Sequence, residues 1–144
     1  MIKLYMKSIL TIFACIMMLL PFSVAAQVRV LSENIEFSGK IGTSQRKSLI
    51  IQNESNQAKE YTLKFLRGNI GSSQNIKVCI DDRCFDPKKD LSKIKLNLEP
   101  NEIYTDLYLE FDLGITEIRG SFDLHFANPT NIRDVFLIEA VYEV

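Results

Sequence analysis

The sequence predicts an all-β protein, a single antiparallel sandwich that follows an N-terminal signal peptide. Apolar residues recur at every second position in several segments after residue 26, which is the period of a strand with one buried face. Short stretches rich in Gly, Asn, Pro and Ser separate these segments. No stretch after residue 26 keeps apolar residues at helical spacing for three turns. Short strands without intervening helices are typical of sandwiches and barrels.

The first 26 residues have the three parts of a secretory signal peptide. Lys3 and Lys7 give a positive start, an uncharged stretch with an apolar run follows up to Leu20, and small residues precede Gln27. We expect cleavage between Ala26 and Gln27. The apolar run is shorter than the roughly 20 residues that a membrane-spanning helix needs. The sequence therefore predicts domain boundaries of 1–26 for the leader and 27–144 for the fold, with no membrane span after cleavage.

A second interpretation of the leader starts from Cys15. Ile12-Phe13-Ala14-Cys15 is similar to a bacterial lipoprotein cleavage box, and its use would anchor the protein through a lipid. The residues after Cys15 remain strongly apolar, whereas a mature lipoprotein usually continues into a polar tether. This pattern favours the signal peptide.

Removal of the leader leaves 118 residues, enough for one hydrophobic core. The formal charge changes from −1 to −3, because Lys3 and Lys7 are lost and no acidic residue is. Without a basic excess the chain is not expected to bind nucleic acid. Two cysteines remain, Cys79 and Cys84, and an even number in an exported chain predicts a disulfide.

Four segments show the alternation most clearly, and their apolar members are expected to face the core. These members are Tyr61, Leu63 and Phe65; Ile94, Leu96 and Leu98; Leu107, Leu109 and Phe111; and Phe122, Leu124 and Phe126. We expect about seven to nine strands, some very short. In chain order, the segments that carry them are 28–31, 35–39, 45–52, 58–66, 76–80, 84–86, 93–98, 103–112, 121–127 and 134–143.

Turn signals separate the strands, and the last strand differs from the others. The turns are Asn53 to Asn56, Gly68 to Ser73, Glu99 to Glu102, Gly114 to Gly120 and Asn128 to Asn131. In the last strand the residues from Val135 to Ile138 are apolar on both faces. Such a pattern favours a centrally placed strand, or one that is covered.

Cys79 and Cys84 bracket four residues and can face each other across a hairpin, within the separation that a disulfide requires. The rival interpretation is a redox dithiol, which usually has the spacing Cys-x-x-Cys at the start of a helix. A zinc site would need two further ligands, and His125 is the only histidine. We therefore expect a structural disulfide, no metal and no cofactor.

The candidate contact residues lie in this hairpin and in the strand at 103–112. Asp81, Asp82 and Arg83 form the hairpin tip. Tyr104 and Tyr108 are four residues apart and are expected to share the outward face of their strand, where exposed tyrosines can form a flat patch for protein or sugar. The same pattern also fits a strand that is partly covered on both faces.

Catalysis is not expected. His125 lies on the face of its strand opposite Leu124 and Phe126, beside Asp123, as a general base could. The sequence contains no Gly-x-Ser-x-Gly, no His-Glu-x-x-His and no glycine-rich phosphate loop. We assign no catalytic residue.

Several short motifs together resemble those of exported immunoglobulin-like β-sandwich modules of bacterial envelopes. They are also similar, loosely, to the ASPM/SPD-2/hydin and major-sperm-protein-like sandwiches. The motifs are Asn53-Glu54-Ser55, Cys79…Cys84-Phe85-Asp86-Pro87, Leu98-Glu99-Pro100-Asn101-Glu102, Gly120-Ser121-Phe122 and Phe126-Ala127-Asn128-Pro129. The resemblance spans about residues 45–130 and departs from antibody domains, because the long-range cysteine pair and the core Trp are missing.

The resemblance implies a non-enzymatic binding or structural module, located in the periplasm or at the cell surface. Its partner would be another envelope or surface protein, contacted through a sheet face or an added edge strand. Two alternatives remain, a small secreted carbohydrate-binding module or hydrolase and a small outer-membrane β-barrel. Eight membrane strands of about ten residues barely fit in the mature length.

Overall fold

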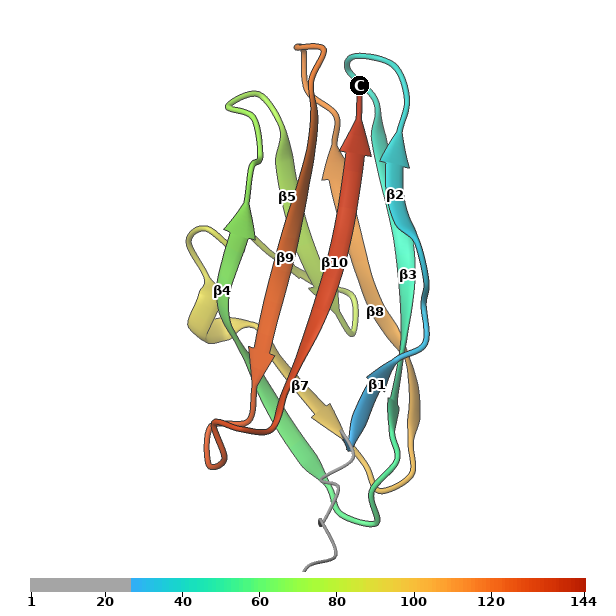
Figure 1. Ribbon diagram of the computed structural model, residues 1–144, viewed down its shortest axis with the longest axis vertical. Coiled ribbons are helices and arrows are strands. Elements are labelled where there is room, and N and C mark those ends of the chain that lie inside the picture. The colour runs from blue at the N-terminus through green and yellow to red at the C-terminus, as the bar shows by residue number, and fades with distance from the viewer. Residues whose placement is uncertain (1–26) are drawn as a thin grey trace, which may run out of the picture.

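The computed structural model describes residues 27–144 as two five-stranded sheets that pack face to face (Figure 1). Sheet A contains, in order across the sheet, β1 (Val28–Val30), β3 (Ser44–Asn53), β8 (Ile103–Asp112), β5 (Asn75–Ile80) and β6 (Arg83–Phe85). Sheet B contains β2 (Ile35–Ser38), β10 (Val135–Glu143), β9 (Arg119–Ala127), β4 (Lys59–Gly68) and β7 (Lys95–Leu98). A short 3-10 helix, η1 (Leu91–Lys93), precedes β7.

The predicted sandwich is confirmed, and its strands fall in the expected segments. Residues 27–144 form ten strands rather than about seven to nine, because β1, β2, β6 and β7 each form a ladder although they have only three or four residues. The predicted leader and Cys15 lie outside the described residues. Within residues 27–144 no helix is long and apolar enough to cross a membrane.

The pairing is antiparallel throughout, except between β2 and β10, which run parallel. The exception arises because the first strand of the sandwich is split between the sheets. β1 pairs with β3 in sheet A, the chain then crosses through Asn34 in a left-handed conformation, and β2 continues in the same direction along the edge of sheet B (Figure 1).

The core lies between the sheets and is rich in aromatic rings. Phe122, Leu124 and Phe126 are at most 1% exposed, so this predicted inward face is confirmed. Phe111 of sheet A contacts three rings of sheet B. Their centroids lie 5.1 Å away for Phe37, 5.6 Å for Phe122 and 4.9 Å for Tyr142. Aromatic pairs at such distances add to the free energy gained by burial.

A β-bulge in β4 reverses the predicted orientation of Phe65. Leu63 pairs with Phe126 and Phe65 pairs with His125, so β4 has one extra residue, Lys64, opposite β9. The alternation shifts by one position, Leu66 turns toward the core and Phe65 points outward with 46% of its surface exposed. The prediction that Phe65 faces the core is wrong.

A second bulge, in β8, separates the two tyrosines. Leu107 pairs with Leu49 and Tyr104 pairs with Ile51, so three steps along β8 match two steps along β3. Tyr104 therefore turns into the core, with 9% exposure, whereas Tyr108 remains on the outward face. The prediction that the two tyrosines share an outward patch is wrong.

Replacement of Phe111 by Ala tests the aromatic core. The ring is fully buried and its loss leaves a cavity between the sheets, so the free energy of unfolding should fall by about 3–5 kcal/mol. Urea denaturation followed by circular dichroism measures the change. Ile115→Ala, at a side chain 75% exposed, is the matched control and should change it by less than about 0.5 kcal/mol. An equal effect of both substitutions would contradict the assigned core.

Candidate functional site

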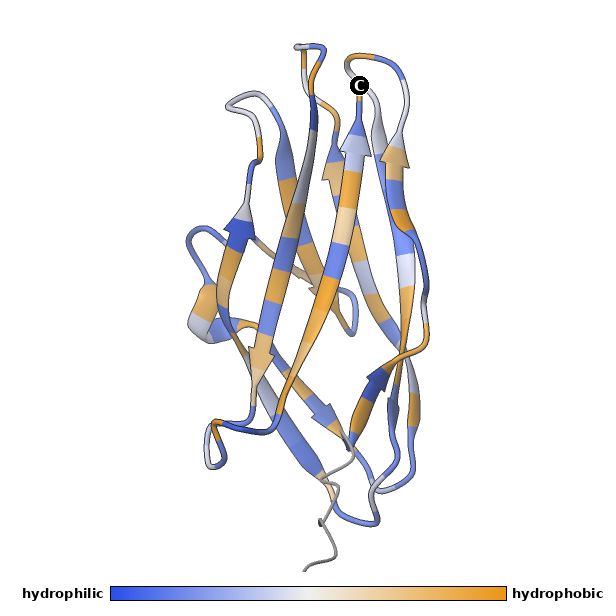
Figure 2. Cartoon of the chain, in the orientation of Figure 1, coloured by the Kyte–Doolittle hydropathy of each residue, from blue (hydrophilic) through white to orange (hydrophobic). Residues whose placement is uncertain are grey.

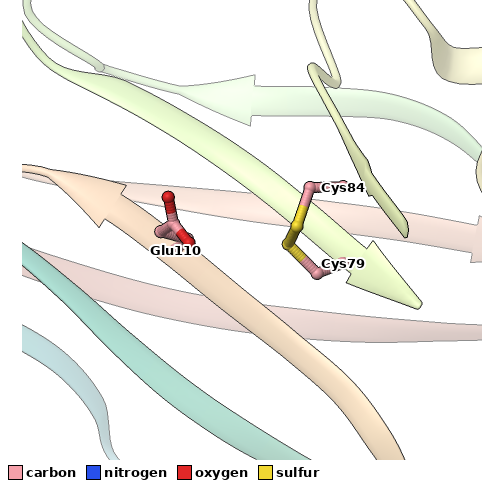
Figure 3. A group of neighbouring side chains, drawn as sticks. All are labelled: Cys79, Cys84 and Glu110. Atoms are coloured by element: carbon pink, nitrogen blue, oxygen red, sulfur yellow. A yellow bond between two sulfur atoms is a disulfide. The ribbon is translucent and has the colours of Figure 1, made fainter. Parts of the chain in front are cut away.

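The predicted disulfide is present and joins β5 to the edge strand β6 (Figure 3). Cys79 and Cys84 are directly opposite in the ladder, with their Cα atoms 4.0 Å apart. Asp81 and Asp82 form the turn between the strands, and both have positive φ angles, 48° and 64°. A two-residue hairpin turn of this type accepts Asp because its side chain tolerates the left-handed conformation. The bond therefore closes the hairpin whose tip carries candidate contact residues.

Glu110 lies next to the disulfide, on the neighbouring strand β8 (Figure 3). The two sulfur atoms and a carboxylate oxygen of Glu110 lie within 4.8 Å of one another. The sulfurs are bonded to each other, so they offer no thiolate to a metal ion. Glu110 instead pairs with Arg46 at 3.2 Å and with Lys77 at 3.6 Å. This arrangement is a cross-strand ion network on the outer face of sheet A.

Tyr108 lies at the centre of this face but offers no free aromatic platform. The Arg46 guanidinium lies 4.2 Å from the centre of its ring. Its hydroxyl lies 3.6 Å from Cys84 Sγ. One face of the ring is therefore already occupied by a cation of the same molecule.

A hollow of about 360 Å³ beside Tyr108 brings together three of the predicted contact residues. Its lining residues are Arg46, Ser48, Asp81, Asp82, Thr105, Asp106 and Tyr108. Arg83 is exposed on β6 and lies outside this lining. Tyr104 is buried and does not line the hollow, but its hydroxyl donates a 2.5 Å hydrogen bond to Oδ1 of the lining residue Asp81. Burial, and then this hydrogen bond, raise the pKa of the Tyr104 hydroxyl well above its usual range.

The outer face of sheet B carries a different surface, a row of three side chains across its central strands. Phe65 of β4, His125 of β9 and Leu137 of β10 are direct neighbours in the two ladders. The rings of Phe65 and His125 stack with their centroids 4.1 Å apart. Phe65 is 46% exposed and Leu137 is 42% exposed. We call these three residues the apolar row.

The charge state of His125 is set by its neighbours in and beside the apolar row. Arg67 Nη2 lies 3.1 Å from His125 Nε2 and donates to it, so the ring proton of the neutral imidazole lies on Nδ1. Desolvation, and then the charge of Arg67, lower the pKa of His125, while Asp123 acts in the opposite direction. The imidazole therefore contributes a neutral, half-buried aromatic surface at neutral pH.

The sequence predicted only part of this surface. The outward position of His125 was expected, and the unbroken apolar run from Val135 to Ile138 is visible in the sequence. Figure 2 shows the first part of β10 as a continuous orange stretch. The structure places β10 next to the edge strand β2, which pairs with it only from Ala140 to Glu143. The expectation that the stretch from Val135 to Ile138 is centrally placed or covered is therefore wrong, and the outward side chains Val135, Leu137 and Val141 are 42–52% exposed. Phe65 was missed because no residue near Lys64 signals the bulge.

Comparison with known proteins defines the fold. No protein-family model and no curated sequence matches this chain. The ASH/PapD-like domain 7 of human CEP192 has a similar structure, with a TM-score of 0.52 and 12% identity over 87% of this chain and 91% of that one. WR4, an MSP family member of C. elegans, gives a TM-score of 0.47 and 7% identity over 83% and 99%. The likeness to the PapD-like domain confirms an immunoglobulin-like sandwich.

A pH titration of His125 by NMR tests the environment assigned to the imidazole. We expect a midpoint below the ordinary value of 6.5, and Arg67→Gln should raise it because a nearby positive charge is removed. The unfolded chain takes up this proton more readily than the folded one. The free energy of unfolding should therefore fall as the pH drops from neutral through 6.5, and less so in His125→Gln. An unchanged midpoint in Arg67→Gln would contradict the assigned contact.

Proposed function

We propose that this chain is an exported, non-enzymatic binding module of the bacterial cell envelope that contacts a partner protein through the outer face of sheet B. The single observation that carries the proposal is the apolar row. Phe65, His125 and Leu137 lie in the middle of a sheet face that is open to solvent. Exposed apolar side chains that adjoin one another on a sheet are typical of protein interaction sites.

The edge of β10 beside this row supports the same function. β2 pairs with β10 only from Ala140 to Glu143. Over Val135 to Glu139, the described part of the chain places a ladder on the β9 side of β10 and none on the other. Unpaired backbone groups next to exposed Val135 and Leu137 can accept a strand from a partner. A partner could thus contact both the face and the edge of the same strand.

Export is supported by the composition of the leader and by the disulfide. A hairpin closed by Cys79 and Cys84 is typical of a protein that folds in an oxidising compartment, the periplasm or the cell surface. The proposed mature chain is 27–144, which includes every strand of the sandwich. The proposed mechanism is contact alone, with no catalytic residue, metal or cofactor assigned.

The mass of the protein recovered from its native host tests export and processing. We expect the mass of residues 27–144, and we expect reduction to add the mass of two hydrogen atoms, as required for one disulfide. Mass spectrometry of the periplasmic and surface fractions measures both. The unprocessed mass of 144 residues, or a lipid-modified chain that begins at Cys15, would contradict the proposed leader.

Substitution within the apolar row tests the binding function. Phe65→Ser combined with Leu137→Ser removes two exposed apolar side chains, so partner proteins captured from the envelope fraction should bind at least about tenfold more weakly. Quantitative capture with a tagged protein, followed by titration of the captured partner, measures the change.

The matched control for that experiment removes apolar surface elsewhere. Ile103→Ser combined with Ile115→Ser replaces side chains that are 57% and 75% exposed and lie outside sheet B. This control should bind as the unmodified protein does, and the circular dichroism of both double variants should be unchanged. Equal capture by the Phe65/Leu137 variant and the unmodified protein would disprove the assigned face.

A further inference from the structure

Acidic side chains flank the apolar row on the outer face of sheet B. One row further along the strands, Arg67 of β4, Asp123 of β9 and Glu139 of β10 are direct neighbours in the two ladders. Beyond them, Val141 of β10 pairs with Glu36 of β2. The face thus changes from apolar to acidic within a few residues along β10.

Two of these carboxylates are not neutralised. Asp123 lies 3.9 Å from Arg67, measured between Oδ2 and Nε. Neither Glu36 nor Glu139 forms an ion pair with any residue of 27–144, and both are exposed. Asp123 and Glu139 also oppose each other directly across the strands. Like charges in this position destabilise a sheet, so the fold alone gives no reason for them.

The surface between these carboxylates is hollowed. Two hollows of about 500 Å³ each share the lining residues Glu36, Ser121 and Val141. The first is also lined by Asp123 and Glu139, and the second by Arg119 and Glu143, which neutralise each other in an ion pair of 2.8 Å. Val141 is 49% exposed and the small side chain of Ser121 leaves room beside it. An apolar side chain with carboxylates around it is complementary to a segment that carries both apolar and cationic groups.

We propose that this acidic groove, formed by Glu36, Ser121, Asp123, Glu139 and Val141, binds a cationic segment of the partner protein, in which Lys or Arg side chains stand beside apolar ones. The inference rests on the proposed function and names the chemistry of its partner. The apolar side chains of the segment cover the apolar row and Val141. Its cations pair with Glu36 and Glu139, which removes the repulsion between Glu139 and Asp123.

Two other occupants fit the surface less well. A second copy of this chain, docked through the same face about a twofold axis, would bring the unpaired carboxylates of both copies into one interface. A divalent metal ion requires ligand atoms that converge. Among the described residues the group close enough is Cys79, Cys84 and Glu110, on the other sheet.

Peptide binding tests the inference directly. The probe is a short synthetic peptide that alternates lysine with valine, labelled with a fluorophore, and its counterpart has glutamate in place of lysine. Fluorescence anisotropy with the purified protein should show binding of the lysine peptide only. The dissociation constant should rise between about 50 and about 500 mM salt, because exposed ion pairs are screened. Glu36→Gln combined with Glu139→Gln should raise it about tenfold.

The control variant removes two carboxylates from the opposite face. Asp82→Asn combined with Asp106→Asn changes the net charge by the same amount and alters the outer face of sheet A. It should bind the lysine peptide as the unmodified protein does. Equal weakening by both double variants would mean unspecific attraction and would overturn the inference.

Other outcomes would also overturn it. These are equal binding of both peptides, no binding of the lysine peptide, or a dimer in analytical ultracentrifugation that Glu36→Gln with Glu139→Gln strengthens. The proposed function is tested separately by capture with the Phe65/Leu137 variant. If that variant loses its envelope partner while the lysine peptide fails to bind, the outer face of sheet B is confirmed as the binding face. The inference that the partner segment is cationic is then wrong.

Discussion

The contact of Phe111 with Phe37, Phe122 and Tyr142 is the packing on which the rest of the structure depends. It joins β8 of sheet A to three strands of sheet B through buried rings. Because side chains alternate along a strand, placing these rings in the core decides which neighbours face outward. The outward positions of Glu110 on sheet A and of His125 and Leu137 on sheet B follow from that packing, whereas Phe65 faces outward because of the bulge in β4.

The two outer faces differ in how many of their apolar and charged side chains have partners within the molecule. On sheet A, Arg46 covers Tyr108 and pairs with Glu110, and the disulfide ties β6 to β5. On sheet B, Leu137 stays exposed, and Glu139 forms no ion pair within the described residues. A face that exposes apolar side chains and unpaired charges gains most from a partner protein, because binding replaces their contacts with water by contacts with the partner.

The recurrence of apolar residues at every second position was sufficient to predict the sandwich, the strand segments and the burial of Phe122. This alternation can be read from the local sequence because each strand buries one of its two faces. The hairpin disulfide followed from cysteine number and spacing. The outward turn of Phe65 and the inward turn of Tyr104 could not be predicted. Each depends on a bulge, which shifts the alternation by one residue, and neither bulge contains a Gly that would mark it in the sequence.

The acidic groove also lies where it can prevent the open edge of β10 from pairing with the same edge of a second copy. The first half of β10 presents unpaired backbone groups, which in another copy would offer a template for the same strand. Glu36 and Glu139 lie close to that edge, so two copies that approach through it bring like charges together. A cationic partner meets attraction at the same place. The apolar row would then supply affinity, while the carboxylates discriminate between the partner and a second copy.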